Sequence, residues 1–266
     1  MTSSAPGAVA VTVSGERPGY LAEVLGSWRR VRGVEAWPVT FLVEPGTRVP
    51  ECQAVIADAF PDADVVVHPE RRGVRANPYD ALARVFDGGA AFAVLAEEDI
   101  VVSDDVLEYL GHGAAAHRDD PSVLALCAFS PLPAPQPADA VGTSGFTAWV
   151  WGTWVDRWRE LLEPHWFDIA VGPEPGVEEG FDFGIDRVRQ ATGRRILAPL
   201  ASRSDNIGQY GGVHALPEEF EESRAATFAP HRPPQRFREL PVGVAGDLAR
   251  RGAPGNAGVP PLPSWT

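Results

Sequence analysis

Residues 91–100, Ala-Phe-Ala-Val-Leu-Ala-Glu-Glu-Asp-Ile, decide the fold that the sequence predicts. The first six are small or apolar and follow a glycine pair, a pattern typical of a strand that is buried on both faces. Glu97, Glu98 and Asp99 come directly after them. Because a buried strand cannot carry these charges inward, we expect them just past its carboxyl end, where open α/β sheets bind ligands.

Carboxylates crowded at such an edge repel one another and retain protons unless a cation relieves them. Hard oxygen ligands of this kind suit Mg²⁺ or Mn²⁺. The stretch therefore predicts a metal site that receives a phosphate-bearing ligand. The alternative is an acidic loop that is simply exposed to solvent.

The composition limits the class of protein. The chain has 266 residues, enough for one large α/β domain or two small ones, and its net charge of −13 argues against a broad surface for nucleic acid or anionic membranes. It contains no lysine, which excludes a Schiff-base lysine and the lysine-bearing phosphate loop. Cys52 and Cys127 lie in apolar stretches, where we expect buried free thiols. Since no signal peptide or membrane-length apolar run is evident, we expect a soluble, cytoplasmic protein.

The first third of the chain predicts parallel strands joined by helices. β-branched and apolar residues indicate strands at 8–13, 39–43 and 64–67, and helical spacing indicates helices at 20–31 and 52–60. This order favours right-handed crossovers within an α/β domain whose mixed, mostly parallel sheet is flanked by helices.

An arginine-rich loop at 68–78 precedes a predicted helix at 79–86. Arginine forks pair with phosphate oxygens, so the loop can hold a diphosphate, although a solvated loop is an equally good interpretation. Beyond the acidic stretch, the pattern predicts a helix at 104–116 and a strand at 122–128. The proline-rich run at 130–137 indicates either disorder or the wall of a site.

Tryptophans at 149, 151, 154, 158 and 166 crowd a segment that we expect to become helical at 153–162. Flat rings match the apolar face of a sugar, which makes Trp149 and Trp151 candidate contacts for an acceptor. Tryptophans at helical spacing are also typical of a hydrophobic core.

Asp182 lies near the start of a helix predicted at 180–193, where the helix dipole favours an ionised carboxylate; a plain capping role is the alternative. A strand at 195–199 and a glycine-rich polar loop at 202–214 follow, and such loops can order over a ligand. From residue 216 the sequence indicates an extended, partly disordered tail. The predicted division is therefore a catalytic-type domain at 1–215 and an extension at 216–266.

The order of these pieces resembles the GT-A class of nucleotide-sugar glycosyltransferases, and in particular the inverting N-acetylglucosaminyltransferase I family. The acidic triplet at 97–99 stands where that family has its Glu-Asp-Asp version of the DXD motif. Residues 161–166, Leu-Leu-Glu-Pro-His-Trp, are similar to its Leu-Glu-Pro-Lys-Trp segment. The loop from Ser202 to His214 resembles its Ser-Arg-Thr and Gly-Val-Ser-His loop. The likeness covers roughly residues 8–215.

This resemblance implies a metal-dependent inverting glycosyltransferase. The enzyme would move a sugar, by default N-acetylglucosamine, from a UDP-sugar to a hydroxyl acceptor. Asp99 and His214 would ligate Mn²⁺ or Mg²⁺, and Glu98 would face the ribose. Arg17 falls where the family has a donor-binding arginine, and Glu44 where it has an acid near the uracil. The candidate donor-binding residues are Arg17, Glu44, Arg75, Asn77, Glu97 and Glu98.

Asp182 is the candidate general base. The family's Trp-Asp-Asp-Trp element appears here as Phe-Asp-Phe-Gly at 181–184, and an ungapped match sets its second aspartate opposite Phe183. The pattern from Asp182 to Arg187 also resembles the Glu-Asp segment of the broader inverting family-two transferases, with Asp186 in reserve. Two rivals stay open: a sugar-phosphate nucleotidylyltransferase, whose glycine-rich N-terminal phosphate loop is missing here, and a catalytically silent carbohydrate-binding protein of transferase-like fold.

Overall fold

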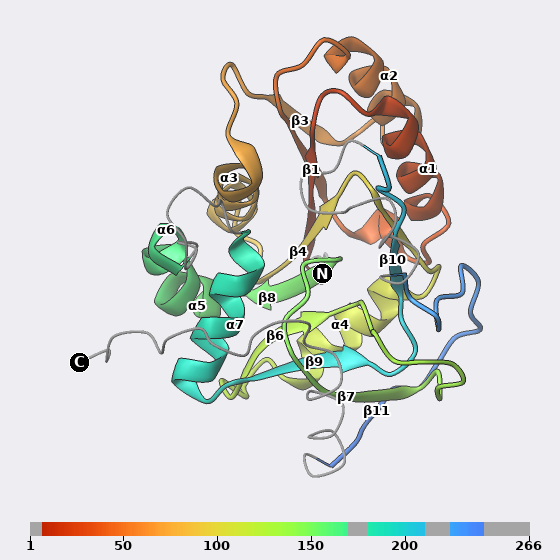
Figure 1. Cartoon of the computed structure of the whole chain (residues 1–266), viewed down its shortest axis with the longest axis vertical. Coiled ribbons are helices and arrows are strands. Elements are labelled where there is room, and N and C mark those ends of the chain that lie inside the picture. The colour runs from red at the N-terminus through yellow and green to blue at the C-terminus, as the bar shows by residue number, and fades with distance from the viewer. Residues whose placement is uncertain (1–6, 170–179, 211–223, 242–266) are drawn as a thin grey trace, which may run out of the picture.

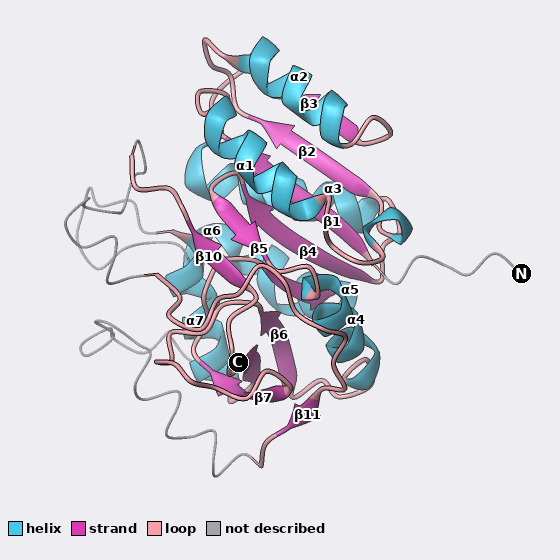
Figure 2. Ribbon diagram, turned by 90° about the vertical axis from the view of Figure 1, so that its right-hand side faces the viewer, coloured by secondary structure: helices cyan, strands magenta, loops and turns pink. Residues whose placement is uncertain are grey.

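A mixed sheet of nine strands organises the molecule. The structure, a computed structural model, describes residues 7–169, 180–210 and 224–241. The strand order is β11-β7-β9-β6-β8-β4-β1-β2-β3, and helices cover both faces (Figures 1 and 2). A second, two-stranded sheet pairs β10 with β5.

The first half is the predicted parallel unit. Its elements are β1 (Ala8–Val13), α1 (Pro18–Trp28), a 3-10 turn (Val34–Ala36), β2 (Val39–Val43), α2 (Val49–Ala59), β3 (Asp64–Val67), α3 (Gly73–Asp87) and β4 (Phe92–Glu97). All four strands are parallel to their neighbours within this unit. Side chains of β1 alternate between the faces: Val9, Val11 and Val13 pack with α1 and α2, while Ala8 and Ala10 pack with α3.

The second half makes the sheet mixed. Its elements are β5 (Ile100–Val102), α4 (Val106–Ala116), β6 (Val123–Cys127), β7 (Ala140–Ser144), β8 (Trp151–Trp154), α5 (Val155–Arg157), a π-helical turn (Trp158–Leu162), a 3-10 turn (Glu163–His165), α6 (Trp166–Ile169), α7 (Phe181–Thr192), β9 (Arg195–Pro199), β10 (Ser204–Asn206) and β11 (Arg238–Glu239). β8 runs antiparallel between β4 and β6, and β7 runs antiparallel to β9.

One predicted helix boundary was wrong, and one strand was not predicted. The helix expected from residue 79 begins at Gly73, so Pro78 lies inside α3. Proline costs a helix one hydrogen bond, and burial of Asn77 and Pro78 offsets that loss. The segment expected to be helical at 153–162 is helical from Val155 to Leu162. Strand β8 before it was not predicted and takes the first two of those residues, because pairing with β4 and β6 outweighs the helical spacing of the tryptophans.

Part of the predicted C-terminal extension packs onto the domain. β11 pairs with β7 at the edge of the main sheet. The backbone N–H of Arg232 donates to Asp104 at 2.9 Å, and the Arg224 guanidinium pairs with Asp205 at 2.6 Å. These contacts tie residues 224–241 to the segments around β5 and β10.

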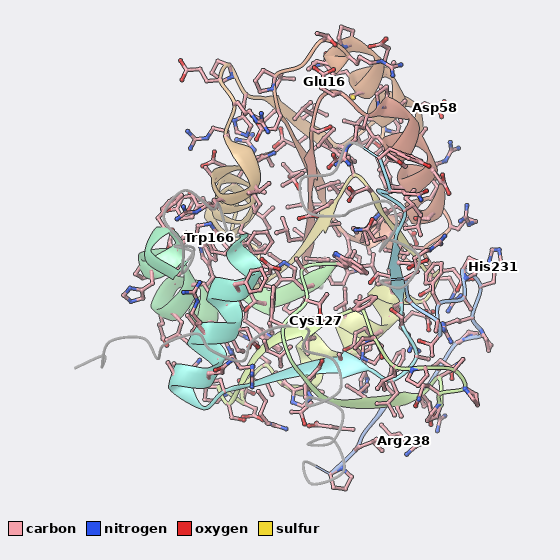
Figure 3. The ribbon with its side chains drawn as sticks, viewed as in Figure 1. Glu16, Asp58, Cys127, Trp166, His231 and Arg238 are labelled. Carbon is pink, nitrogen blue, oxygen red and sulfur yellow. The ribbon has the colours of Figure 1, made fainter. Side chains whose placement is uncertain are left out.

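The interior is apolar where the sequence predicts it. Cys52 and Cys127 are buried free thiols, as expected, and Figure 3 places Cys127 in the middle of the molecule. Burial raises the pKa of Cys127 to about 12, which excludes it as a nucleophile at neutral pH. None of the helices in the described ranges combines the length and the apolar character that a membrane span needs.

Candidate active site

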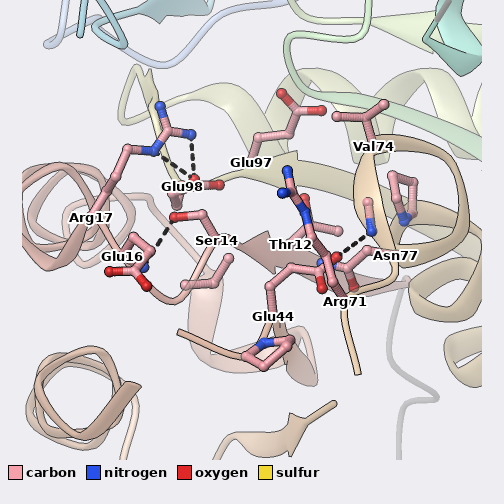
Figure 4. Close-up of a pocket in the computed structure, with 14 residues that line it drawn as sticks. Thr12, Ser14, Glu16, Arg17, Glu44, Arg71, Val74, Asn77, Glu97 and Glu98 are labelled. Carbon is pink, nitrogen blue, oxygen red and sulfur yellow. Dashed lines mark hydrogen bonds and ion pairs between the residues drawn. The ribbon is translucent and has the colours of Figure 1, made fainter. Parts of the chain in front are cut away.

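A pocket of about 370 Å³ opens at the carboxyl ends of β1, β2 and β4. Thr12 and Val13 come from the end of β1, Glu44 follows β2, and Glu97 closes β4. Figure 4 shows side chains from these three strand ends converging on one space. Parallel strands bring their carboxyl ends to one edge, so residues far apart in the sequence meet here.

Arg17 joins the two acidic residues that follow β4. Its Nε donates to Glu98 Oε1 at 3.0 Å, its Nη2 donates to the same oxygen, and its Nη1 lies 3.0 Å from Asp99 Oδ2. Glu98 and Asp99 are only 5% and 8% exposed, so this pairing is what balances their charge in the interior. The structure thus brings together three of the predicted site residues.

Burial and repulsion between neighbouring charges raise the pKa values of Asp99 and Glu97. Burial, followed by the charge of Glu98, raises the pKa of Asp99 to about 6, although Arg17 opposes the shift. Burial and the charges of Asp99, Glu98 and Asp182 raise the pKa of Glu97 well above its ordinary value. Such a group of acids can accept a further cation.

Asp99 offers one oxygen to that cation. Its Oδ1 is buried and has no hydrogen-bond partner in the described part of the chain, whereas Oδ2 faces Arg17. Within the described ranges, no set of three or more His, Cys, Asp or Glu side chains could hold a metal. The buried Oδ1 of Asp99 fits a divalent ion attached through one carboxylate oxygen, a mode that Mg²⁺ uses when substrate phosphates complete its coordination. The other predicted ligand, His214, lies outside the described residues.

The glycine-rich loop predicted to order over a ligand crosses Asp99. The backbone N–H of Ile207 donates to the Asp99 carbonyl at 2.8 Å. A Cβ built on Gly208 would meet the Asp99 carboxylate, lying 2.8 Å from its Cγ, so only glycine permits this approach. Gly208 belongs to the loop that carries the family resemblance, but the sequence assigned it no role at the site.

Glu44 holds the start of α3. Its Oε2 accepts the backbone N–H of Arg72 at 2.8 Å, and its Oε1 accepts that of Gly73 at 2.7 Å. Asn77 lines the same pocket but is also anchored, since its Nδ2 donates to the Leu42 carbonyl at 3.3 Å. Donor contacts by Glu44 and Asn77 remain predictions.

The arginine-rich segment presents a different arginine from the one predicted. Arg75 does not line the pocket; its Nη2 donates to the Phe167 carbonyl at 2.6 Å. Arg71 lines the pocket instead, and Figure 4 shows its side chain extending from the region of Glu44 into that space. The sequence signal, three arginines in one segment, was present but did not distinguish among them.

The two candidate bases occupy different environments. Asp182 lies in the first turn of α7, and its charge adds to the rise in the pKa of Glu97 after burial and the charges of Asp99 and Glu98. Asp186 is buried and accepts hydrogen bonds from Arg189 Nε at 2.6 Å, Gln190 Nε2 at 2.7 Å and the Phe146 N–H at 3.2 Å. Burial would raise the pKa of Asp186, but these bonds outweigh it and lower the pKa. This environment suits a structural anchor better than a proton acceptor.

The two tryptophans predicted to contact the acceptor differ in their exposure to solvent. Trp151 is 0% exposed and packs against Phe146 and Phe181, so a sugar cannot stack on it, and this assignment was wrong. The core interpretation of the tryptophan-rich segment explains Trp151, because β8 lies inside the sheet. Trp149 is partly buried edge-on against Phe129 and remains a candidate.

Comparison with known proteins places the fold. No family model and no curated protein matches the chain. It is similar to the crystal structure of S. aureus TarS 1–349, with a TM-score of 0.51 and 13% identity, over 74% of this chain and 59% of that one. It is also similar to mannosyltransferase PcManGT from Pyrobaculum calidifontis, solved with GDP-Man and Mn²⁺, with a TM-score of 0.47 and 19% identity, over 75% of this chain and 59% of that one. The chain thus spans about three fifths of each of these structures. Its α/β fold, with a mixed and mostly parallel sheet, is like that of GT-A glycosyltransferases; the likeness to the N-acetylglucosaminyltransferase I family stays a prediction.

Proposed function

We propose that this protein transfers a sugar from a nucleoside diphosphate sugar, by default a UDP-sugar, to a hydroxyl acceptor with inversion at the anomeric carbon. One arrangement carries the proposal. A pocket at the carboxyl ends of three parallel strands is lined by Arg17, Glu97 and Glu98, and Arg17 also pairs with Asp99. The charge of Asp182 adds to the rise in the pKa of Glu97. A GT-A-like fold is consistent with this chemistry, although fold alone does not define an activity.

The residues divide the reaction between them. Asp182 accepts the proton of the acceptor hydroxyl while that oxygen forms a bond to the anomeric carbon. The bond from the anomeric carbon to the diphosphate oxygen breaks, and its electron pair leaves with the nucleoside diphosphate. Because attack and departure occur on opposite sides, an α-linked donor gives a β-linked product.

Asp99 Oδ1 is the group that would hold a divalent ion, Mn²⁺ or Mg²⁺. Such an ion supplies Lewis-acid neutralisation of the charge that develops on the leaving diphosphate. Arg17 orients the Asp99 carboxylate by its ion pair with Oδ2, and Glu98 holds Arg17 in place by a second ion pair.

Release of UDP from a panel of UDP-sugars in the presence of Mn²⁺ tests the proposal. The parent protein should hydrolyse one donor slowly, and Asp99→Asn should abolish that release. Asp62→Asn, an exposed aspartate outside the pocket, serves as the matched control and should behave as the parent.

Equal release by the parent and by Asp99→Asn would contradict the metal assignment. If no donor reacts, with or without a panel of hydroxyl acceptors, the transferase proposal fails. Pyrophosphate release from UTP and a sugar 1-phosphate would then identify the nucleotidylyltransferase, and binding without turnover would identify the silent carbohydrate-binding protein.

A further inference from the structure

The proposed donor pocket is lined by more acidic than basic side chains. Four glutamates line it, Glu16, Glu44, Glu97 and Glu98. A nucleoside diphosphate adds further negative charge, so binding requires cations that are available to its phosphates.

Most arginines near the pocket are already engaged. Arg17 pairs with Glu98 and Asp99. The Arg72 guanidinium donates to Asp80 at 2.6 and 3.1 Å, and Arg75 donates to the Phe167 carbonyl.

Arg71 differs from these three. It lines the pocket, its side chain is exposed, and it makes no hydrogen bond or ion pair with any residue in the described part of the chain. Figure 4 shows its side chain reaching into the pocket from the Glu44 side. Arg71 is therefore a cation that a ligand can recruit without breaking an existing pair.

Glu44 holds the backbone next to Arg71 through hydrogen bonds. Both oxygens of this carboxylate are used, one for the N–H of Arg72 and one for that of Gly73. Gly73 has a φ of +72°, a left-handed conformation that favours glycine and turns the chain into α3. Glu44 is only 8% exposed, so its two hydrogen bonds to the backbone of Arg72 and Gly73 are shielded from solvent.

We propose that Arg71 binds the diphosphate of the nucleotide donor, and that Glu44 is a positioning residue that aims Arg71 rather than a contact for the nucleobase. The inference rests on the proposed function, because it assumes that the pocket takes a nucleoside diphosphate. It assigns the pocket's phosphate contact to Arg71 in place of Arg75.

Isothermal titration with UDP and with uridine, each with Mn²⁺ present, tests Arg71. A charge-assisted contact predicts that Arg71→Ala binds UDP about tenfold to hundredfold more weakly while uridine affinity is unchanged. Arg236→Ala is the matched control: Arg236 is also exposed, lies outside the pocket and should bind UDP as the parent does. Thermal melting of each variant confirms folding.

A double-mutant cycle tests Glu44. Glu44→Gln should weaken UDP binding several-fold in the parent background and should add little in the Arg71→Ala background, because its effect passes through Arg71. If Glu44→Gln weakens uridine binding equally in both backgrounds, Glu44 contacts the base and its positioning role is refuted.

The outcomes separate the two levels of the proposal. UDP binding by the parent with no loss in Arg71→Ala overturns the Arg71 assignment and leaves the transferase proposal standing. A parent that binds neither UDP nor GDP overturns both.

Discussion

Replacing Gly208 by alanine tests the packing of the glycine-rich loop on Asp99. The added Cβ would lie nearest Asp99 Oδ2, 2.8 Å from Cγ and 3.0 Å from the Asp99 Cβ. Asp99 cannot rotate away freely, because it is 8% exposed and its Oδ2 is paired with Arg17 at 3.0 Å. Either that pair lengthens, or the loop moves and the 2.8 Å bond from Ile207 to the Asp99 carbonyl is lost.

Both responses cost stability and displace Asp99. Overpacking of this kind costs about 1–3 kcal/mol of unfolding free energy. For a chain of this size, that corresponds to a melting temperature lower by roughly 2–10 °C. Metal-dependent donor hydrolysis should fall more than the folded fraction does, because the displaced carboxylate is the proposed ion ligand.

Thermal unfolding and Mn²⁺-dependent UDP release, measured on the same samples, provide the assay. Gly26→Ala is the control, since a Cβ there meets nothing within 4 Å and α1 should gain up to about 1 kcal/mol. If Gly208→Ala keeps both the parental melting temperature and the parental activity, the loop does not pack on Asp99 as described.

Three further predictions concern charged groups. Arg17→Ala should lose about 3 kcal/mol of stability by leaving its two acidic partners uncompensated, and Mn²⁺ should raise its melting temperature more than that of the parent; an equal rise would contradict the shared site. Asp186→Asn should lower stability most at neutral pH. Because the folded pKa of Asp186 is lowered, its contribution is present above about pH 4 and is lost as the pH falls through that folded pKa, so urea unfolding should show a smaller difference in stability between the parent and Asp186→Asn at pH 3 than at pH 7. Asp105→Ala should cost about 3–5 kcal/mol in urea unfolding, since it leaves Arg203, 0% exposed and 3.2 Å away, without its buried counter-charge; a loss below 1 kcal/mol would refute that account.

The sequence predicted the fold well where one physical signal dominates. The stretches 8–13 and 39–43 are rich in apolar and β-branched residues, and the structure places strands at those residues. The acidic stretch after 91–96 ends a buried strand, as expected, although Glu97 is still part of β4. Prediction failed where tertiary contacts override local pattern. Pro78 indicated a helix boundary, yet α3 continues across it, and helical spacing of tryptophans concealed the strand β8.

The candidate site was predicted only in part, because tertiary contacts decide where its side chains point. The end of a buried strand placed Glu98 and Asp99 at the ligand-binding edge of the sheet, whereas Arg17 was a candidate only through the family resemblance; the structure joins the three by ion pairs. The direction of a side chain depends on contacts that sequence does not reveal. Arg75 faces the Phe167 carbonyl while Arg71 faces the pocket, and nothing in the spacing of the arginines distinguishes them.

Asp182→Asn tests the central claim most directly, with donor affinity and donor turnover measured on the same protein. We expect UDP-sugar affinity to be retained while transfer falls by on the order of 10² to 10⁴, since the amide cannot accept the acceptor proton. Asp186→Asn, corrected for its folded fraction, should keep the parental rate. Transfer by Asp182→Asn at the parental rate would contradict the assignment of the base, and with it the proposed mechanism.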